Sequence, residues 1–245
     1  MNLVLITATE QAEGFAPTDE RTQHLCDTVG VKVGATFYVG LPQGPRGLAT
    51  VPAVQPRLTF TVAWEKIVQP RLPLVVLVGL PRPQTAKKVL HDLASLGADE
   101  IIFFDAEKGD PSYATSSLWK EEQWLEPLKK GTEQACSTQL PQVHRRASLK
   151  EALLHLPTDA WRVALDPYEA EGALGNQSPT AQPAILALGP ERGWSSAERI
   201  LLRENKFKFY HLGDRILRVE AAALVGGALL LAQLKVWQAH QPLRG

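Results

Sequence analysis

Cysteine is scarce in this 245-residue chain, and its histidines are scattered. Cys26 and Cys136 are the two cysteines, too few for a fold held by disulfides. The histidines show no spacing typical of a metal site, so we expect no bound metal. A low cysteine content is also typical of reducing compartments. We therefore expect a cytoplasmic protein.

Long apolar segments are missing as well. The most apolar stretch, residues 221–234, carries no charge but is too short to cross a bilayer. The N-terminal sequence MNLVLITATEQ lacks the basic region of a signal peptide. We expect no membrane association, and we expect residues 221–234 to form a buried core helix.

The chain has no excess charge, with 26 basic and 26 acidic residues. A dedicated nucleic-acid-binding protein usually has a basic excess, so the overall charge argues against one. The segment 192–218 nevertheless predicts a local basic patch. Its members are Arg192, Arg199, Arg203, Lys206, Lys208, Arg215 and Arg218.

The sequence divides into two regions that differ in their pattern of apolar residues. Residues 1–71 contain short β-branched and aromatic runs separated by glycine and proline, and predict a small β-barrel of about five strands. These runs lie at 3–6, 35–41, 48–54 and 58–64, with a short helix possible at 19–29 and a hinge at 69–73.

Residues 72–245 alternate between apolar strands and amphipathic helices, which predicts an α/β domain with a mainly parallel sheet. The strands are expected at 74–79, 100–105, 161–166, 184–189 and 207–212. Helices are expected at 85–96 and 117–136, and after the capping boxes that open at Ser148 and Ser195.

Two glycine-bearing turns follow predicted strands in this second region. Gly189–Gly193 reads GPERG, and Leu212–Arg218 reads LGDRILR. Such turns bind ligands in open α/β sheets, but taken alone they are more often ordinary strand–turn–helix connections. Neither turn has the GxGxxG or GxxxxGK[ST] pattern of nucleotide-binding loops. For Arg215 the simplest expectation is an ion pair with Asp214.

The two turns together closely resemble a family signature. The motifs GPE-x-G-(W/F)-S-x-x-E and LG-x-RILR-x-E occur in order in the RsmE-type 16S rRNA (uracil-N3)-methyltransferases of the SPOUT superfamily. Weaker similarities lie at 93–104 and at Glu133-Gln134 with Pro141. The resemblance implies a trefoil-knot α/β domain at 72–245 and a PUA-like, RNA-binding β-barrel at 1–71.

The resemblance also implies S-adenosylmethionine as cofactor, ribosomal RNA of the small subunit as partner, and a homodimer. Arg218 and Glu220 would be the catalytic residues, with Arg218 stabilising charge on the uracil. The cofactor-binding residues implied by the match are Leu188, Gly189, Pro190, Glu191, Gly193, Leu212, Gly213, Ile216, Leu217 and Arg218. No general base is identified.

The chain departs from the family pattern at several positions. Arg192 replaces a glycine of the GPEGG turn, and Val219 and Ala221 replace the threonines of R-T-E-T-A. Ser137 replaces the arginine of E-Q-S-x-R, and Asp92 replaces a lysine. Two alternatives therefore stand beside the methyltransferase: a catalytically silent paralogue that binds RNA or a partner, and an enzyme with another methyl acceptor.

Overall fold

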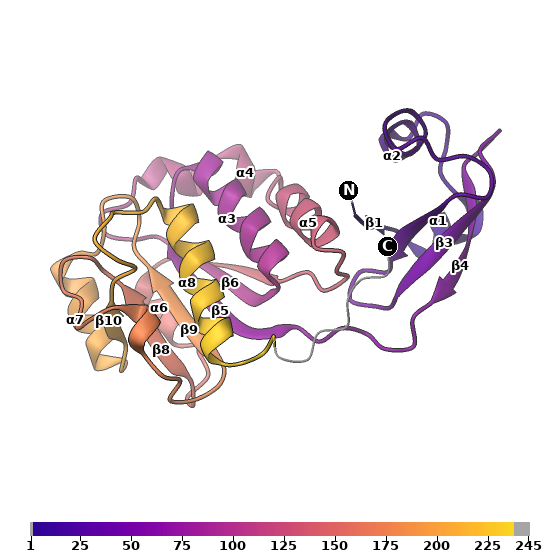
Figure 1. The fold of residues 1–245 in the computed structure, drawn as a ribbon. Coiled ribbons are helices and arrows are strands. Elements are labelled where there is room, and N and C mark those ends of the chain that lie inside the picture. Colours follow the sequence, from indigo (N-terminus) through magenta and orange to yellow (C-terminus); the bar gives the residue numbers. More distant parts are fainter. Residues whose placement is uncertain (1, 238–245) are drawn as a thin grey trace. The chain divides into compact units, whose positions relative to one another are not determined.

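The computed structural model describes residues 2–237, which divide into two compact units (Figure 1). The N-terminal unit comprises the described residues up to Pro70 together with Thr132–Leu140. The α/β unit comprises Arg71–Gly131 and the described residues from Pro141 onward. The sequence had not predicted that Thr132–Leu140 packs with the N-terminal unit.

The described part of the N-terminal unit contains a sheet of four strands rather than the expected five or so. The order is β1-β2-β3-β4, with β1 and β2 parallel and the other pairs antiparallel. Phe15 and Phe60 pack with ring centroids 5.1 Å apart in the core beneath the sheet. The elements are β1 (Val4–Leu5), α1 (Ala8–Glu13), α2 (Glu20–Gln23), a π-helical turn (His24–Thr28), β2 (Thr36–Gly40), β3 (Arg46–Ala53) and β4 (Thr59–Trp64).

Hydrogen bonds fix Thr132–Leu140 within the N-terminal unit. The buried carboxylate of Glu133 accepts the Leu5 backbone N–H at 2.9 Å. The Gln43 backbone N–H donates to the Thr138 carbonyl at 2.8 Å. Arg46 donates to the Cys136 carbonyl at 3.0 Å. The segment therefore supplies partners for strands that lie far from it in the sequence.

The α/β unit is built on a six-stranded parallel sheet of order β10-β8-β9-β5-β6-β7. The predicted strands are all present, and one strand, β7, was missed. The hinge predicted at 69–73 overlaps β5, which begins at Leu72. The strands are β5 (Leu72–Gly79), β6 (Ala98–Phe104), β7 (Gln142–Arg146), β8 (Trp161–Leu165), β9 (Ala184–Leu188) and β10 (Lys208–Tyr210).

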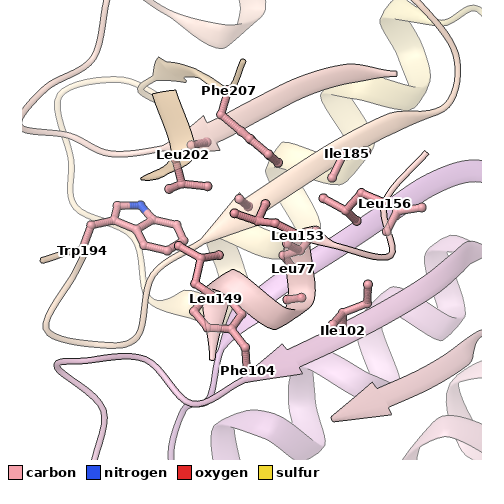
Figure 2. Close-up of a cluster of buried hydrophobic side chains, with 14 of the residues drawn as sticks. Leu77, Ile102, Phe104, Leu149, Leu153, Leu156, Ile185, Trp194, Leu202 and Phe207 are labelled. Carbon is pink, nitrogen blue, oxygen red and sulfur yellow. The ribbon is translucent and has the colours of Figure 1, made fainter. Parts of the chain in front are cut away.

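Helices cover both faces of this sheet. On one face, α3 (Pro83–Leu96) packs against α8 (Val219–Gln233), and α8 also contacts β5 and β9. On the other face, α6 (Leu149–Leu153) and α7 (Ser196–Glu204) close a core of alternate strand residues (Figure 2). Figure 2 shows Leu77, Ile102, Phe104 and Ile185 among them.

The helix expected at 117–136 is interrupted. The structure has α4 (Ser117–Lys120) and α5 (Leu125–Gln134), separated by Glu122 at a φ of 54°. Pro127 lies in the first turn of α5, where a proline needs no N–H partner. Two 3-10 turns lie in connections between elements: Pro111–Thr115 between β6 and α4, and Leu174–Asn176 between β8 and β9.

The core helix predicted at 221–234 is present as α8, but one of its faces is exposed. Ala223, Leu230 and Leu231 are buried, but Leu224 and Val225 are 38% and 42% exposed. Among the described residues, no helix has the length and apolar character that a membrane crossing requires.

Candidate functional site

A large pocket opens at the carboxyl ends of β8, β9 and β10. Its volume is about 980 Å³, and Leu165, Leu188 and Tyr210, the last residues of these strands, line it. Every residue predicted for the site lies on its lining: Leu188, Gly189, Pro190, Glu191, Gly193, Leu212, Gly213, Ile216, Leu217, Arg218 and Glu220. The fold thus brings the two glycine-bearing turns to one cavity.

The first turn, Gly189–Gly193, needs its glycines for steric reasons. Gly193 adopts a φ of 68°, and its N–H donates to the Pro190 carbonyl at 2.7 Å. A side chain at Gly189 would place Cβ 3.1 Å from the Gly193 carbonyl carbon. Pro190 packs so closely on Gly79 of β5 that a Cβ there would lie 2.7 Å from Pro190 Cδ. The backbone can therefore approach a ligand that a larger residue would exclude.

Trp194 fixes the end of this turn to the sheet. Its ring is buried and stacks on Phe104, with centroids 6.0 Å apart and planes at 7° (Figure 2). Its indole N–H donates to the Leu165 carbonyl at 2.9 Å, which links the turn after β9 to the end of β8. The Trp194 carbonyl accepts from Lys108 Nζ at 2.8 Å. Because Trp194 is so held, the pocket wall beside it is fixed in place.

The predicted capping box at the start of α7 is present in full. Ser195 Oγ accepts the Glu198 N–H at 3.0 Å, and the Glu198 carboxylate accepts the Ser195 N–H at 2.9 Å. The buried Glu198 also accepts the Glu107 N–H at 3.1 Å, from the loop after β6. This one carboxylate therefore joins two segments that border the pocket.

The second turn is held by His211. The Gly213 N–H donates to His211 Nδ1 at 3.0 Å, and Gly213 has a φ of 111°, which favours glycine. In this arrangement Nδ1 of the ring carries no proton, so the neutral ring has its hydrogen on Nε2. Ile216 and Leu217 follow with 75% and 38% of their surface exposed. The turn therefore offers exposed apolar side chains to the cavity.

Glu191 has a structural contact besides its place on the lining. Its Oε1 accepts the Arg82 backbone N–H at 3.0 Å, immediately before α3. The Arg82 side chain also lines the pocket and donates from Nε to Thr85 Oγ1 at 3.1 Å. Glu191 therefore ties the first turn to the start of α3, a contact that the motif alone did not indicate.

The ion pair expected between Asp214 and Arg215 is absent among the described residues, and Arg218 forms none with Glu220. Glu220 instead lies 3.6 Å from Lys88 Nζ of α3, with 13% of its side chain exposed. Arg215 and Arg218 line the pocket without a carboxylate within 4 Å in the described chain. The cavity therefore has guanidinium groups available for an anionic ligand.

The predicted basic patch is divided by the fold. Arg199 and Arg203 form ion pairs with acidic residues after β8, whereas Arg192 lines the pocket. Hydrogen bonds from Ser112 chiefly lower the pKa of Asp110, and the charge of Arg192 lowers it further. Arg192, the larger side chain at the fourth position of the GPERG turn, therefore lines the pocket together with the acidic Asp110.

Several lining residues had not been predicted. Asp166, Lys108 and Tyr168 follow parallel strands, and this position was the available signal, because ligands bind at the carboxyl ends of such strands. Burial raises the pKa of the Tyr210 phenol, which keeps it a neutral hydrogen-bonding group. Within residues 2–237, no cluster of three or more histidine, cysteine and acidic residues could hold a metal ion.

Comparison with known proteins matches residues 68–231 to the model of an RNA methyltransferase domain, about two thirds of the chain. The chain belongs to this RNA methyltransferase family. The match covers the sheet and both turns of the pocket. It also agrees with the family resemblance of the two motifs.

Curated relatives match along the whole length. Ribosomal RNA small subunit methyltransferase E of Treponema pallidum is 30% identical over 100% of this chain and 96% of its own length. Ribosomal RNA small subunit methyltransferase E 1 of Borreliella burgdorferi is 27% identical over 96% of this chain and 99% of its own.

A solved structure shares the fold. It is a ribosomal RNA small subunit methyltransferase E from Neisseria gonorrhoeae bound to S-adenosyl methionine, with a TM-score of 0.74 and 21% identity. The alignment covers 97% of this chain and 98% of that one. With its parallel sheet, the α/β unit fits the SPOUT fold.

Proposed function

We propose that this chain transfers a methyl group from S-adenosylmethionine to N3 of a uracil in 16S ribosomal RNA. The observation that carries the proposal is the pocket itself, because the glycine-bearing turns of both family motifs lie on its lining. Membership of the RNA methyltransferase family and the names of the relatives support the reaction and the RNA class. The N3 position rests on the motif resemblance.

The residues of the pocket fit such a cofactor. Its volume of about 980 Å³ lies at the upper end of small-molecule sites. Leu188, Leu212 and Ile216 would contact apolar parts of the cofactor, and the backbone at Gly189 and Gly213 would take its polar groups. When bound, the cofactor supplies an electrophilic methyl group on a sulfonium.

The protein's own part in the reaction is orientation and charge stabilisation. Uracil N3 is a weak acid that must lose its proton before or during attack on the methyl group. We assign Arg218 to the developing negative charge, because it lines the pocket and has no carboxylate partner in the described chain. A cation that lines a partly enclosed cavity stabilises such charge more than water does. Glu220, held by Lys88, would orient the start of α8, which carries Arg218.

Four further features belong to the proposal. We infer that the N-terminal unit is a PUA-like domain that binds RNA, that the α/β unit is knotted as in SPOUT enzymes, and that the enzyme works in the cytoplasm on small ribosomal subunits. We also infer a homodimer, because α8 has exposed apolar residues, Leu224 and Val225. The PUA-like domain, the knot and the homodimer are implied by the family resemblance, and the cytoplasmic location is inferred from the low cysteine content.

Titration calorimetry with S-adenosylmethionine tests the cofactor site first. We expect micromolar affinity, about −8 kcal/mol, for the native chain. Gly213→Val should remove it, because the new side chain enters open space on the lining. Gly34→Val is the matched control, since Gly34 also has a positive φ and open space where a Cβ would lie, with no atom within 4 Å, but is outside the pocket.

Methyl transfer is the second half of the test. Unmethylated small ribosomal subunits with a labelled cofactor should yield 3-methyluridine after digestion. Cofactor binding without that product would favour an enzyme with another acceptor. A folded protein with no cofactor binding would favour the silent paralogue, and Arg192→Gly would then show whether the larger residue in the turn is the cause.

A further inference from the structure

Tyr168 is an exposed aromatic residue on the lining of the pocket. The residue is 75% exposed, an unusual exposure for so large a ring, although it lies on the lining of the cavity. Its ring stacks on no other ring or guanidinium among the described residues. Most of the ring surface is therefore open to solvent in the described α/β unit.

The turn that carries Tyr168 is held firmly despite this exposure. The Asp166 carboxylate is buried and accepts the Tyr168 backbone N–H at 2.8 Å. Arg199 Nε of α7 donates to the other carboxylate oxygen at 2.6 Å. Glu169 lies 3.5 Å from Arg199 and also pairs with Arg203. An exposed ring on a braced turn loses little entropy when a ligand stacks on it.

The charges on the same lining favour an anionic ligand. The four acidic residues of the lining have partners. Asp166 has Arg199, Glu191 has the Arg82 backbone, and Glu220 has Lys88. Asp110 accepts the Ser112 backbone N–H at 2.9 Å. Arg215 and Arg218 have no carboxylate within 4 Å in the described chain. A flat aromatic ring on the same lining as available guanidinium groups matches a nucleotide, which combines a stacking face with a phosphate.

We propose that Tyr168 is a stacking site for an unpaired nucleobase of the RNA substrate as that base enters the pocket. The inference rests on the proposed function. Uracil N3 lies on the base-pairing edge, so an RNA methylated there must present the base unpaired and unstacked. The Tyr168 ring replaces the stacking contact that the base loses.

Steady-state methylation of unmethylated small ribosomal subunits tests the inference with three variants. Tyr168→Ala should raise the KM for subunits by about 10- to 100-fold, in the range of a lost base–aromatic stack. Tyr168→Phe keeps the stacking face and should stay within about twofold of the native KM. Leu154→Ala is the control, since Leu154 is 74% exposed and lies outside the pocket lining.

Cofactor affinity, measured by calorimetry, should be unchanged in all three variants. A native KM in Tyr168→Ala would overturn the inference while leaving the proposed function intact. An equal rise in KM for Tyr168→Phe and Tyr168→Ala would also overturn it, because the effect would then belong to the hydroxyl. If Tyr168→Ala instead weakens self-association in sedimentation, the ring belongs to a protein interface.

A native protein without methyl transfer would count against the proposed function, not against stacking. Stacking is then read from fluorescence anisotropy with a labelled single-stranded uridine-rich oligonucleotide. The order native ≈ Tyr168→Phe, both tighter than Tyr168→Ala, supports the site. Equal affinities reject it.

Discussion

Arg218 differs from the nearby arginines in what it contacts. The pKa of Arg199 is raised mainly by its hydrogen bond to Asp166, so that charge is already committed within the fold. Arg218 occupies the N-cap position of α8 and makes no side-chain capping bond. Its charge is therefore available to a ligand, and this distinction is visible only in the folded chain.

Arg218→Ala should lower kcat/KM for methyl transfer by about 100- to 1,000-fold, the usual effect of removing one transition-state donor. Folding should be unchanged, because the side chain is exposed and unpaired in the described chain. Arg218→Lys keeps the charge and should recover part of the rate. Lys208→Ala, an exposed change on β10 outside the pocket, is the control. Full activity of Arg218→Ala would remove this residue from the mechanism.

The residues of the two turns could be predicted from the sequence, but their partners could not. Glycines after parallel strands are a local signal, and the structure places both turns on one cavity. The pair of Glu220 with Lys88 joins segments far apart in the chain. Sequence proximity suggested Asp214 with Arg215 instead, and that pair is absent from the described residues. Exposed neighbours in sequence gain little from pairing, so proximity is a weak guide.

At the scale of elements, β7 shows why a strand can escape detection. Its sequence QVHRR has no apolar run, because it is the edge strand of the sheet and is only partly buried. The central strands β5 and β9 are continuous apolar runs, as expected for strands covered on both faces. The interruption before α5 was also missed, although Pro127 gave a local signal for it.

The edge pair β6–β7 contains a carboxyl group that destabilises the fold at neutral pH. Burial raises the pKa of Glu100, and the nearby Asp99 adds to this, while His144, Arg146 and His155 oppose it. A raised pKa in the folded state means that stability is lost as pH rises through that pKa. Above the folded pKa, the ionised Glu100 carboxylate therefore lowers the stability of the folded state. Below that pKa the carboxyl group is protonated and this loss of stability disappears.

Glu100→Gln should accordingly raise the midpoint of thermal unfolding at about pH 8, by roughly 2–4 °C for an effect near 1 kcal/mol. The gain should shrink toward zero at about pH 4, where the native carboxyl is itself protonated. Glu126→Gln, at a glutamate whose side chain is 61% exposed, is the control and should change little. A gain that is equal at both pH values would show that charge burial is not its cause.

At the scale of the whole molecule, the division of the chain was only partly accessible from the sequence. The change in the pattern of apolar residues near residue 71 is a local property of the sequence. The first segment of the N-terminal unit correspondingly ends at Pro70. The assignment of Thr132–Leu140 to the same unit depends on long-range hydrogen bonds such as Glu133 to Leu5. Such contacts leave no periodic pattern, so composition could not reveal them.

At the same scale, one face of α8 carries exposed apolar residues. Two glycines, Gly226 and Gly227, let the helix pack closely on the sheet and α3, since a Cβ at Gly227 would lie 2.8 Å from Leu96 Cδ2. Leu224 and Val225 remain exposed in the single chain. An apolar surface on so central a helix is the expected mark of an interface between two copies.

Leu224→Asp should therefore convert a dimer to a monomer in sedimentation equilibrium at micromolar concentration, because a buried unpaired carboxylate is costly at an interface. Leu154→Asp places the same charge at an exposed leucine of the other helical layer and should leave the dimer intact. Circular dichroism of both variants controls for folding. A native chain that is already monomeric, or a Leu224→Asp variant that stays dimeric, would exclude this face of α8 as the interface.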